Sequence, residues 1–137
     1  MVHTYSLLPD LFSYASLSPV ILRLILGLVL LNLGWLKLHQ EKNGWIMFMR
    51  AMNVPKPRLV ISTFGIIEII GGLMFMAGLY TQSIALVFIL LGAIQLFIES
   101  KEESLLRRDV VFYLLITAIS LSLLLTGPGM YAIDLPL

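Results

Sequence analysis

The stretch "GIIEIIGG", Gly65 to Gly72, decides the fold because it places one acidic side chain, Glu68, inside a long apolar run. That run extends over about residues 59–79, which is the length of a helix that crosses a bilayer. A charged residue near the middle of such a helix costs about 2.5–3.5 kcal/mol and usually points into a helix bundle. We therefore expect other helices to surround Glu68 and to supply its partners.

The composition of the whole chain is typical of a membrane protein. Hydrophobic residues make up 59% of the 137 residues and charged residues make up 12%, whereas soluble domains contain about 25% charged residues. Four apolar runs are long enough, or nearly long enough, to cross a bilayer. We predict a single all-α membrane domain over residues 1–137. It forms a four-helix transmembrane bundle with spans at about 19–38, 59–79, 82–98 and 109–125.

A short amphipathic segment follows the first predicted span. In "GWIMFMRAMNVPKP", residues 44–57, the apolar residues Trp45, Phe48, Met49 and Met52 fall on one face of a helix. About nine helical residues are too few to cross a membrane. We predict a short interfacial helix between the first and second spans, lying in the headgroup layer. The alternatives are a cap that closes the cytoplasmic end of the bundle, and a gate or partner contact.

The basic residues are distributed unequally between the two sides of the predicted bundle. One side has only Arg23, and the other side has eight basic residues in its two connections. Short loops rich in Lys and Arg stay in the cytoplasm, so we predict a multi-pass protein of the cytoplasmic (inner) membrane with both termini outside. The eight residues are Lys37, Lys42, Arg50, Lys56, Arg58, Lys101, Arg107 and Arg108.

Polar side chains from three predicted spans reach a similar depth. At about 1.5 Å per residue, Glu68, Asn32 and Gln95 all lie about 11 to 13 residues below the outer surface. Arg23 lies roughly 10 Å above Glu68 along the bundle axis, and Lys37 ends the first span. Glu68 is therefore either ion-paired with Arg23 or Lys37, or neutral and hydrogen-bonded to Asn32 or Gln95.

Helical periodicity assigns these residues to faces. On the first span, Asn32 lies opposite a face that consists of Arg23, Gly27, Gly34 and Lys37. On the second span, glycines share the face of Glu68. Small residues on such faces let two helix backbones approach closely, or leave room for a ligand.

Two interpretations of the polar residues remain open. They form either an internal strut that fixes the register of the helices, or a polar pocket that binds a small amphiphile or handles a proton. The candidate polar-core and ligand-binding residues are Arg23, Lys37, Asn32, Glu68 and Gln95, and no residue is assigned to catalysis.

Several classes of chemistry are excluded by the sequence. The chain has no cysteine, so it has no disulfide exchange, no thiolate nucleophile and no Cys-based iron–sulfur or zinc site. Its two histidines, His3 and His39, are too far apart for a bis-His haem pair or an H-E-x-x-H zinc motif, and we predict no metal site. The net charge of +1, without a basic patch, predicts no nucleic-acid partner.

Four features of the chain follow a pattern that is typical of one membrane-protein family. They are Arg23 early in the first span, "GWLK" at its end (Gly34–Lys37), "EIIGGLMFMAGLYT" (Glu68–Thr81) and "LLLTGPGMYAID" (Leu123–Asp134). Their order and spacing resemble the DoxX family of small four-helix bacterial and archaeal membrane proteins, over nearly the whole chain from about Leu22. Two positions depart from the pattern, since Leu33 stands where many members have His and Ala132 replaces the usual Ser.

The resemblance implies a redox-associated membrane protein. The family name comes from a subunit of an archaeal thiosulfate:quinone oxidoreductase, and other members resemble partners in membrane oxidoreductase complexes. We therefore predict an accessory subunit of a quinone-linked membrane redox complex, not catalytic on its own, with a quinone as the candidate cofactor near Arg23 and Glu68. Its predicted partners are the lipid bilayer and other membrane subunits or a second copy. The alternatives are a structural or assembly protein without a ligand, and a small transporter.

Overall fold

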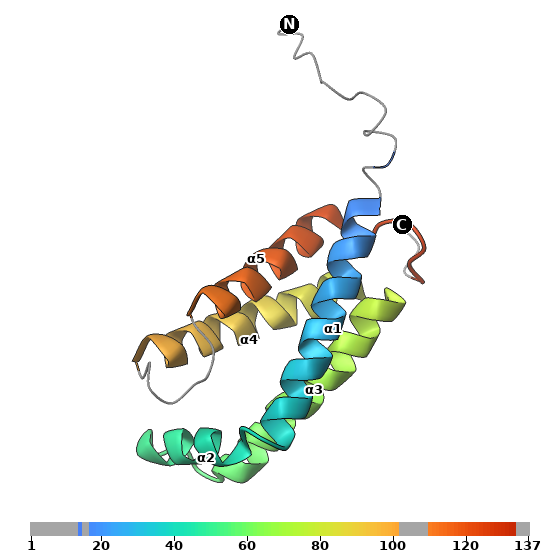
Figure 1. Ribbon diagram of the computed structural model, residues 1–137. Helices are drawn as coiled ribbons and strands as arrows, with labels where there is room; N and C mark the ends of the chain where they lie inside the picture. Colours follow the sequence, from blue (N-terminus) through green and yellow to red (C-terminus); the bar gives the residue numbers. More distant parts are fainter. Residues whose placement is uncertain (1–13, 15–16, 102–109, 134–137) are drawn as a thin grey trace, which may run out of the picture.

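The computed structural model describes residue 14, residues 17–101 and residues 110–133. Within these ranges the chain is helical and contains no strand, so the predicted all-α class is confirmed. Arg107 and Arg108 of the predicted third connection lie outside the described residues. Five helices follow one another (Figure 1), namely α1 (Ser18–Leu38), α2 (Lys42–Ala51), α3 (Pro57–Ala77), α4 (Thr81–Lys101) and α5 (Val110–Thr126).

Proline and glycine mark the ends of the long helices. Pro19 and Pro57 lie in the first turns of α1 and α3, where the missing N–H breaks no intrahelical hydrogen bond. Gly78 ends α3 with a φ of 68°, a left-handed conformation that glycine adopts without a steric penalty. Its N–H donates to the Phe75 carbonyl at 3.1 Å. The chain then reverses direction and begins α4 at Thr81.

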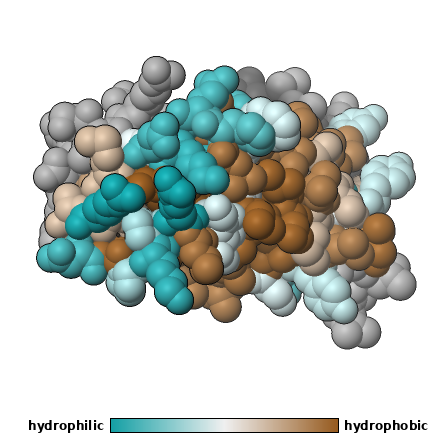
Figure 2. Space-filling view, turned by 90° about the horizontal axis from the view of Figure 1, so that it is seen from below, coloured by the Kyte–Doolittle hydropathy of each residue, from teal (hydrophilic) through white to brown (hydrophobic). Residues whose placement is uncertain are grey.

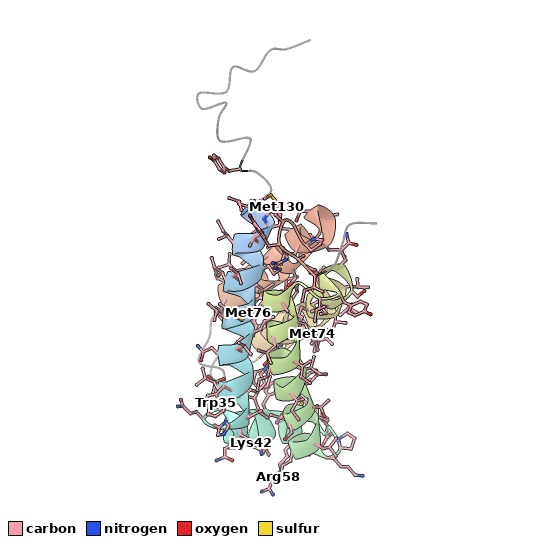
Figure 3. The ribbon with its side chains drawn as sticks, turned by 90° about the vertical axis from the view of Figure 1, so that its right-hand side faces the viewer. Trp35, Lys42, Arg58, Met74, Met76 and Met130 are labelled. Carbon is pink, nitrogen blue, oxygen red and sulfur yellow. The ribbon has the colours of Figure 1, made fainter. Side chains whose placement is uncertain are left out.

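The long helices form two antiparallel pairs. α1 and α3 lie side by side (Figures 1 and 3), and α4 and α5 form the second pair (Figure 1). Contacts of α1 with α5 and of α3 with α4 join the two pairs. α2 lies across the end of the molecule where α1 ends and α3 begins (Figure 1).

Four glycines form the contact between α1 and α3. Gly27 faces Gly72 and Gly34 faces Gly65, so that the backbones of the two helices touch at two levels. A Cβ atom added to Gly72 would lie 2.7 Å from the carbonyl oxygen of Gly27, and one added to Gly34 would lie 2.6 Å from that of Gly65. The close approach expected from the glycine-bearing faces is therefore observed.

Two apolar clusters fill the interior. The larger joins α1, α3, α4 and α5, and the smaller joins α2 to α3 and α4. On α3, Glu68 lies midway between Ile61 of the smaller cluster and Phe75 of the larger one, on the same helical face. The larger cluster consists of Leu26, Leu30, Leu33, Phe75, Ala85, Phe88, Ile116 and Leu123, and the smaller of Trp45, Ile46, Phe48, Met49, Ile61 and Ile98.

The short helix α2 is present, and its apolar face is buried by protein. Trp45, Phe48 and Met49 are buried as their spacing predicts, because they pack against α3 and α4. Met52 is exposed, because the helix ends at Ala51 and the chain turns at Asn53 with a φ of 55°. The observed packing favours the cap at the end of the bundle. A position in the headgroup layer remains a prediction.

The outward faces of the long helices are apolar. Leucine side chains such as Leu28, Leu73, Leu90 and Leu115 are exposed there. By length and composition, three described helical segments can cross a membrane, namely Ser18–Leu38, Pro57–Ala77 and Thr81–Ile98. Helix α5 is apolar but shorter. A fourth crossing therefore remains a prediction.

Hydrophilic side chains gather at one end of the molecule. Figure 2, a view from below, shows them over one part of that end, beside a hydrophobic part. Lys42 and Arg58 lie at this end of the α1–α3 pair, and Met130 lies at the opposite end (Figure 3). The lower end is therefore the basic end of the described chain.

The glycine contact between α1 and α3 predicts a specific sensitivity to side-chain volume. We expect Gly72→Val to lower the free energy of unfolding by about 1–3 kcal/mol, because the new side chain would overlap the Gly27 carbonyl and separate the helices. Thermal unfolding in detergent measures this change. The matched control is Ala118→Leu, which adds the same number of carbon atoms at an exposed position of α5. Equal stability of the two variants would contradict the prediction.

Candidate functional site

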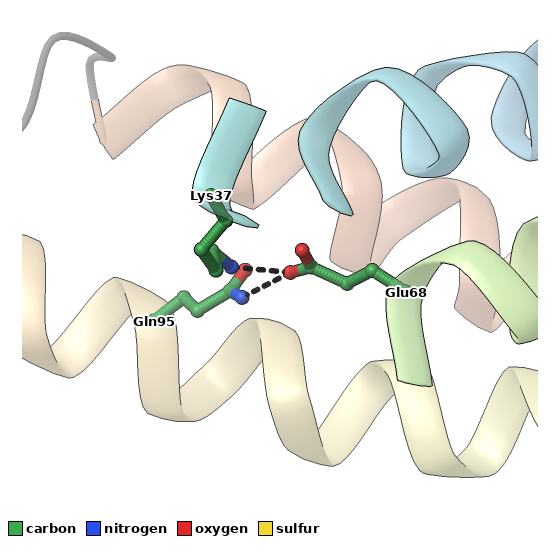
Figure 4. Close-up of polar contacts among 3 residues, drawn as sticks. All are labelled: Lys37, Glu68 and Gln95. Carbon is green, nitrogen blue, oxygen red and sulfur yellow. Dashed lines mark hydrogen bonds and ion pairs between the residues drawn. The ribbon is translucent and has the colours of Figure 1, made fainter. Parts of the chain in front are cut away.

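Three polar side chains from three helices meet in the interior of the molecule. The Lys37 ammonium of α1 donates to Oε1 of Glu68 on α3 at 2.5 Å, and the Gln95 carboxamide of α4 donates to the same oxygen at 2.7 Å (Figure 4). The exposed fractions are 1% for Lys37, 2% for Glu68 and 7% for Gln95. We call these three residues the polar triad. It connects both antiparallel helix pairs.

The direction of the side chains explains why Lys37 reaches Glu68. Gly34 is level with Gly65, so the Cα atoms of Lys37 and Glu68 are separated by roughly 9 Å along the axis. A helical side chain leans toward the N-terminus of its own helix. Because α1 and α3 are antiparallel, Lys37 and Glu68 lean toward each other and close this gap.

A tryptophan from the short helix completes the surroundings of the ammonium group. The Lys37 Nζ atom lies 4.8 Å from the ring centroid of Trp45, a cation–π contact. Trp45 belongs to the buried face of α2. Sequence periodicity placed Trp45 on the apolar face of a short helix, but it did not reveal that this face reaches Lys37. Helix α2 thus covers the basic end of the triad.

Two buried polar atoms at this site have no hydrogen-bond partner among the described residues. They are Oε2 of Glu68, which is an acceptor, and Nε1 of Trp45, which is a donor. Leaving such a buried group unsatisfied costs about 1–3 kcal/mol. The site therefore has one unused hydrogen-bond acceptor and one unused donor, both close to the ion pair.

Arg23 belongs to a different place. Its guanidinium donates to the Pro128 carbonyl at 2.9 Å and to the Tyr131 carbonyl at 3.2 Å, and it packs against Gly78. Arg23 lies above Glu68 on α1 and leans away from it, toward the start of the helix. The structure therefore brings Lys37, and not Arg23, to the carboxylate.

Asn32 also lies outside the polar triad. Its side chain is exposed on the side of α1 that faces away from α3. Of the four partners considered for Glu68, the structure thus brings together Lys37 and Gln95 and leaves Arg23 and Asn32 elsewhere. A role of any of these residues in ligand binding remains a prediction.

The ion pair predicts opposite outcomes for single and double substitution. We expect Lys37→Met to lower the free energy of unfolding by about 3–5 kcal/mol, because it leaves a buried carboxylate without its cation. Lys37→Met combined with Glu68→Leu should recover most of this loss, since a matched apolar pair removes both charges. Unfolding in detergent of the two single variants and the double variant measures the coupling. Additive losses in the double variant would contradict the ion pair.

Comparison with known proteins identifies the family. A sequence model described as DoxX matches residues 18–99, more than half of the chain, and this range includes Lys37, Glu68 and Gln95. No curated protein and no solved structure matches the chain. The match confirms the resemblance seen in the motifs, and it agrees with the three long apolar helical segments. The chain is therefore a membrane protein that belongs to the DoxX family.

Proposed function

We propose that this protein is an accessory subunit of a membrane redox complex and that it binds a small, quinone-like molecule at the polar triad. The observation that supports this proposal most directly is Oε2 of Glu68, which is buried and has no partner among the described residues. Membership of the DoxX family, whose name derives from a quinone-linked oxidoreductase subunit, supports the redox assignment.

The hydrogen-bonding groups at the triad fit a quinone head group. A quinone supplies carbonyl acceptors when oxidised and hydroxyl donors when reduced. Lys37, Gln95 and the Trp45 Nε1 atom are donors suited to the carbonyl oxygens, and Oε2 of Glu68 is an acceptor suited to a hydroxyl group. The isoprenoid-like tail of such a molecule is compatible with the exposed apolar side chains on the outward faces of the long helices.

The chemistry of the triad favours binding and proton handling rather than catalysis by this chain alone. Glu68 holds a negative charge beside Lys37, and it is the one carboxylate among the described residues that lies in the middle of a long apolar helix. A carboxylate in that position can accept the proton of a bound hydroxyl group, and the carboxylic acid that results can return it. Electrons would come from another subunit, in agreement with an accessory role.

The alternative function is a structural one. Glu68 joins α1, α3 and α4 through its two hydrogen bonds, which is also what a strut that fixes helix register would do. The two functions differ in whether a molecule is bound at Oε2, so ligand recovery separates them.

Ligand extraction tests the binding proposal. We expect protein purified under mild conditions to yield a quinone, detected by mass spectrometry, and Glu68→Gln to yield at least about tenfold less, because the amide replaces the acceptor oxygen. The matched control is Thr63→Val, an exposed position on the same helix. Absence of quinone from the unmodified protein, together with a loss of stability in Glu68→Gln, would favour the strut.

We also propose that the chain crosses the cytoplasmic membrane four times, with both termini outside and α2 on the cytoplasmic side. The basic residues Lys42, Arg50, Lys56 and Arg58 lie in or next to α2, and short basic connections remain in the cytoplasm. Helix α5 would complete its crossing with interfacial residues at its ends.

Labelling of single cysteines tests this orientation. The chain has no cysteine of its own, so Lys56→Cys and Tyr131→Cys each introduce one thiol, both at exposed positions. In intact cells without an outer membrane, an impermeant maleimide should label Tyr131→Cys and should label Lys56→Cys only after lysis. The reverse pattern would overturn the orientation, and labelling of both before lysis would overturn the proposed three crossings, by α3, α4 and α5, between the two positions.

A further inference from the structure

One face of α1 is not covered by any other described helix. Its large apolar side chains are 50–57% exposed, and they recur at alternating intervals of four and three residues. This spacing matches the a and d positions of a heptad repeat, the pattern by which two helices pack along a shared seam. We call this face the α1 seam, and it consists of Ile21, Ile25, Leu28, Asn32 and Trp35.

The seam contains one polar side chain near the middle of the predicted span. The carboxamide of Asn32 is exposed and has no hydrogen-bond partner among the described residues. Lipid hydrocarbon offers no donor or acceptor, so a polar group that faces it is left unsatisfied. Asparagine in such a position favours association with another helix that supplies the missing hydrogen bonds.

The chemistry of the seam favours a second copy of the same chain as that partner. A carboxamide is both a donor and an acceptor, so two Asn32 side chains related by a two-fold axis satisfy each other. The seam residues are all uncharged, so two copies meet without repulsion. With Ile25 and Asn32 at a positions and Leu28 at a d position, the seam has the residue types of a parallel two-stranded coiled coil.

We propose that the α1 seam is the interface of a homodimer. The α1 helices of two copies pack in parallel around a two-fold axis that is normal to the membrane, with the Asn32 side chains hydrogen-bonded across the axis. Two copies inserted with the same topology have parallel α1 helices, which is the arrangement this heptad requires. Gly27 and Gly34 point to the opposite side of α1 and stay packed on α3, so dimer formation leaves the polar triad intact.

A stacked aromatic pair lies at the lower end of the seam. Trp35 and His39 are stacked, with their ring centroids 4.1 Å apart, and both are exposed. Aromatic residues of this kind occupy the boundary between hydrocarbon and headgroups. The apolar seam above them, from Ile21 to Leu28 and on to Asn32, is therefore the part that lies in the hydrocarbon.

Cysteine cross-linking of the full-length chain in membranes tests the interface, because the chain has no cysteine that would interfere. Ile25→Cys and Leu28→Cys place single thiols on the seam, and the matched controls Leu90→Cys and Leu115→Cys place them on exposed faces of α4 and α5. We expect oxidation to give a covalent dimer several-fold faster at the seam positions. Equal rates at seam and control positions would overturn the proposal.

A second substitution tests the role of Asn32. In the Ile25→Cys background, Asn32→Leu should weaken dimer formation by at least about threefold in purified protein in phosphatidylcholine vesicles, whereas Asn32→Gln should retain most of it. Unchanged cross-linking of Asn32→Leu would overturn the proposed hydrogen bond. Cross-linking of the seam thiol to another protein in native membranes, with no dimer in vesicles, would assign the seam to a different subunit and overturn the homodimer.

Discussion

The contact between α1 and α3 through Gly27, Gly34, Gly65 and Gly72 fixes the level at which every polar group of these helices lies. Because the two backbones touch at two levels, one helix is unable to slide past the other without a steric clash. This register places Lys37 roughly 9 Å below Glu68 along the axis, within reach of a long side chain that leans upward. The position of the ion pair is thus determined by the four glycines, because their lack of a side chain sets the register of the two helices.

The ion pair lies at the boundary between two apolar clusters. Both of its charges are therefore removed from water, and this removal has a free-energy cost. Burial of a carboxylate and an ammonium group is costly, and their attraction offsets that cost only when the geometry is good and the remaining atoms are hydrogen-bonded. Here Oε1 of Glu68 receives two hydrogen bonds, while Oε2 receives none from the described residues. An apolar triad would hold the same helices together without this penalty.

The sequence alone predicted the helices and the need of Glu68 for partners, but not which partners. The apolar runs and the amphipathic spacing around Trp45 are local patterns, and each of them became a helix at the expected place. The axial distances from Glu68 to Arg23 and to Lys37 are similar, so the depths counted from the sequence did not show which of the two cations pairs with Glu68. The distinction required the register of α1 against α3. The acceptors of Arg23 are backbone carbonyls, which every residue has, and no sequence pattern indicates them.

The bond between Arg23 and the segment after α5 has a consequence for biosynthesis. Arg23 lies in α1, whereas Pro128 and Tyr131 follow 105 and 108 residues later in the chain. During translation the guanidinium therefore lacks these acceptors until α5 and the segment after it have been made. The contacts of this end of α1 are therefore complete only after α5 and the segment that follows it have been made, so the bond of Arg23 reports that this segment is in place.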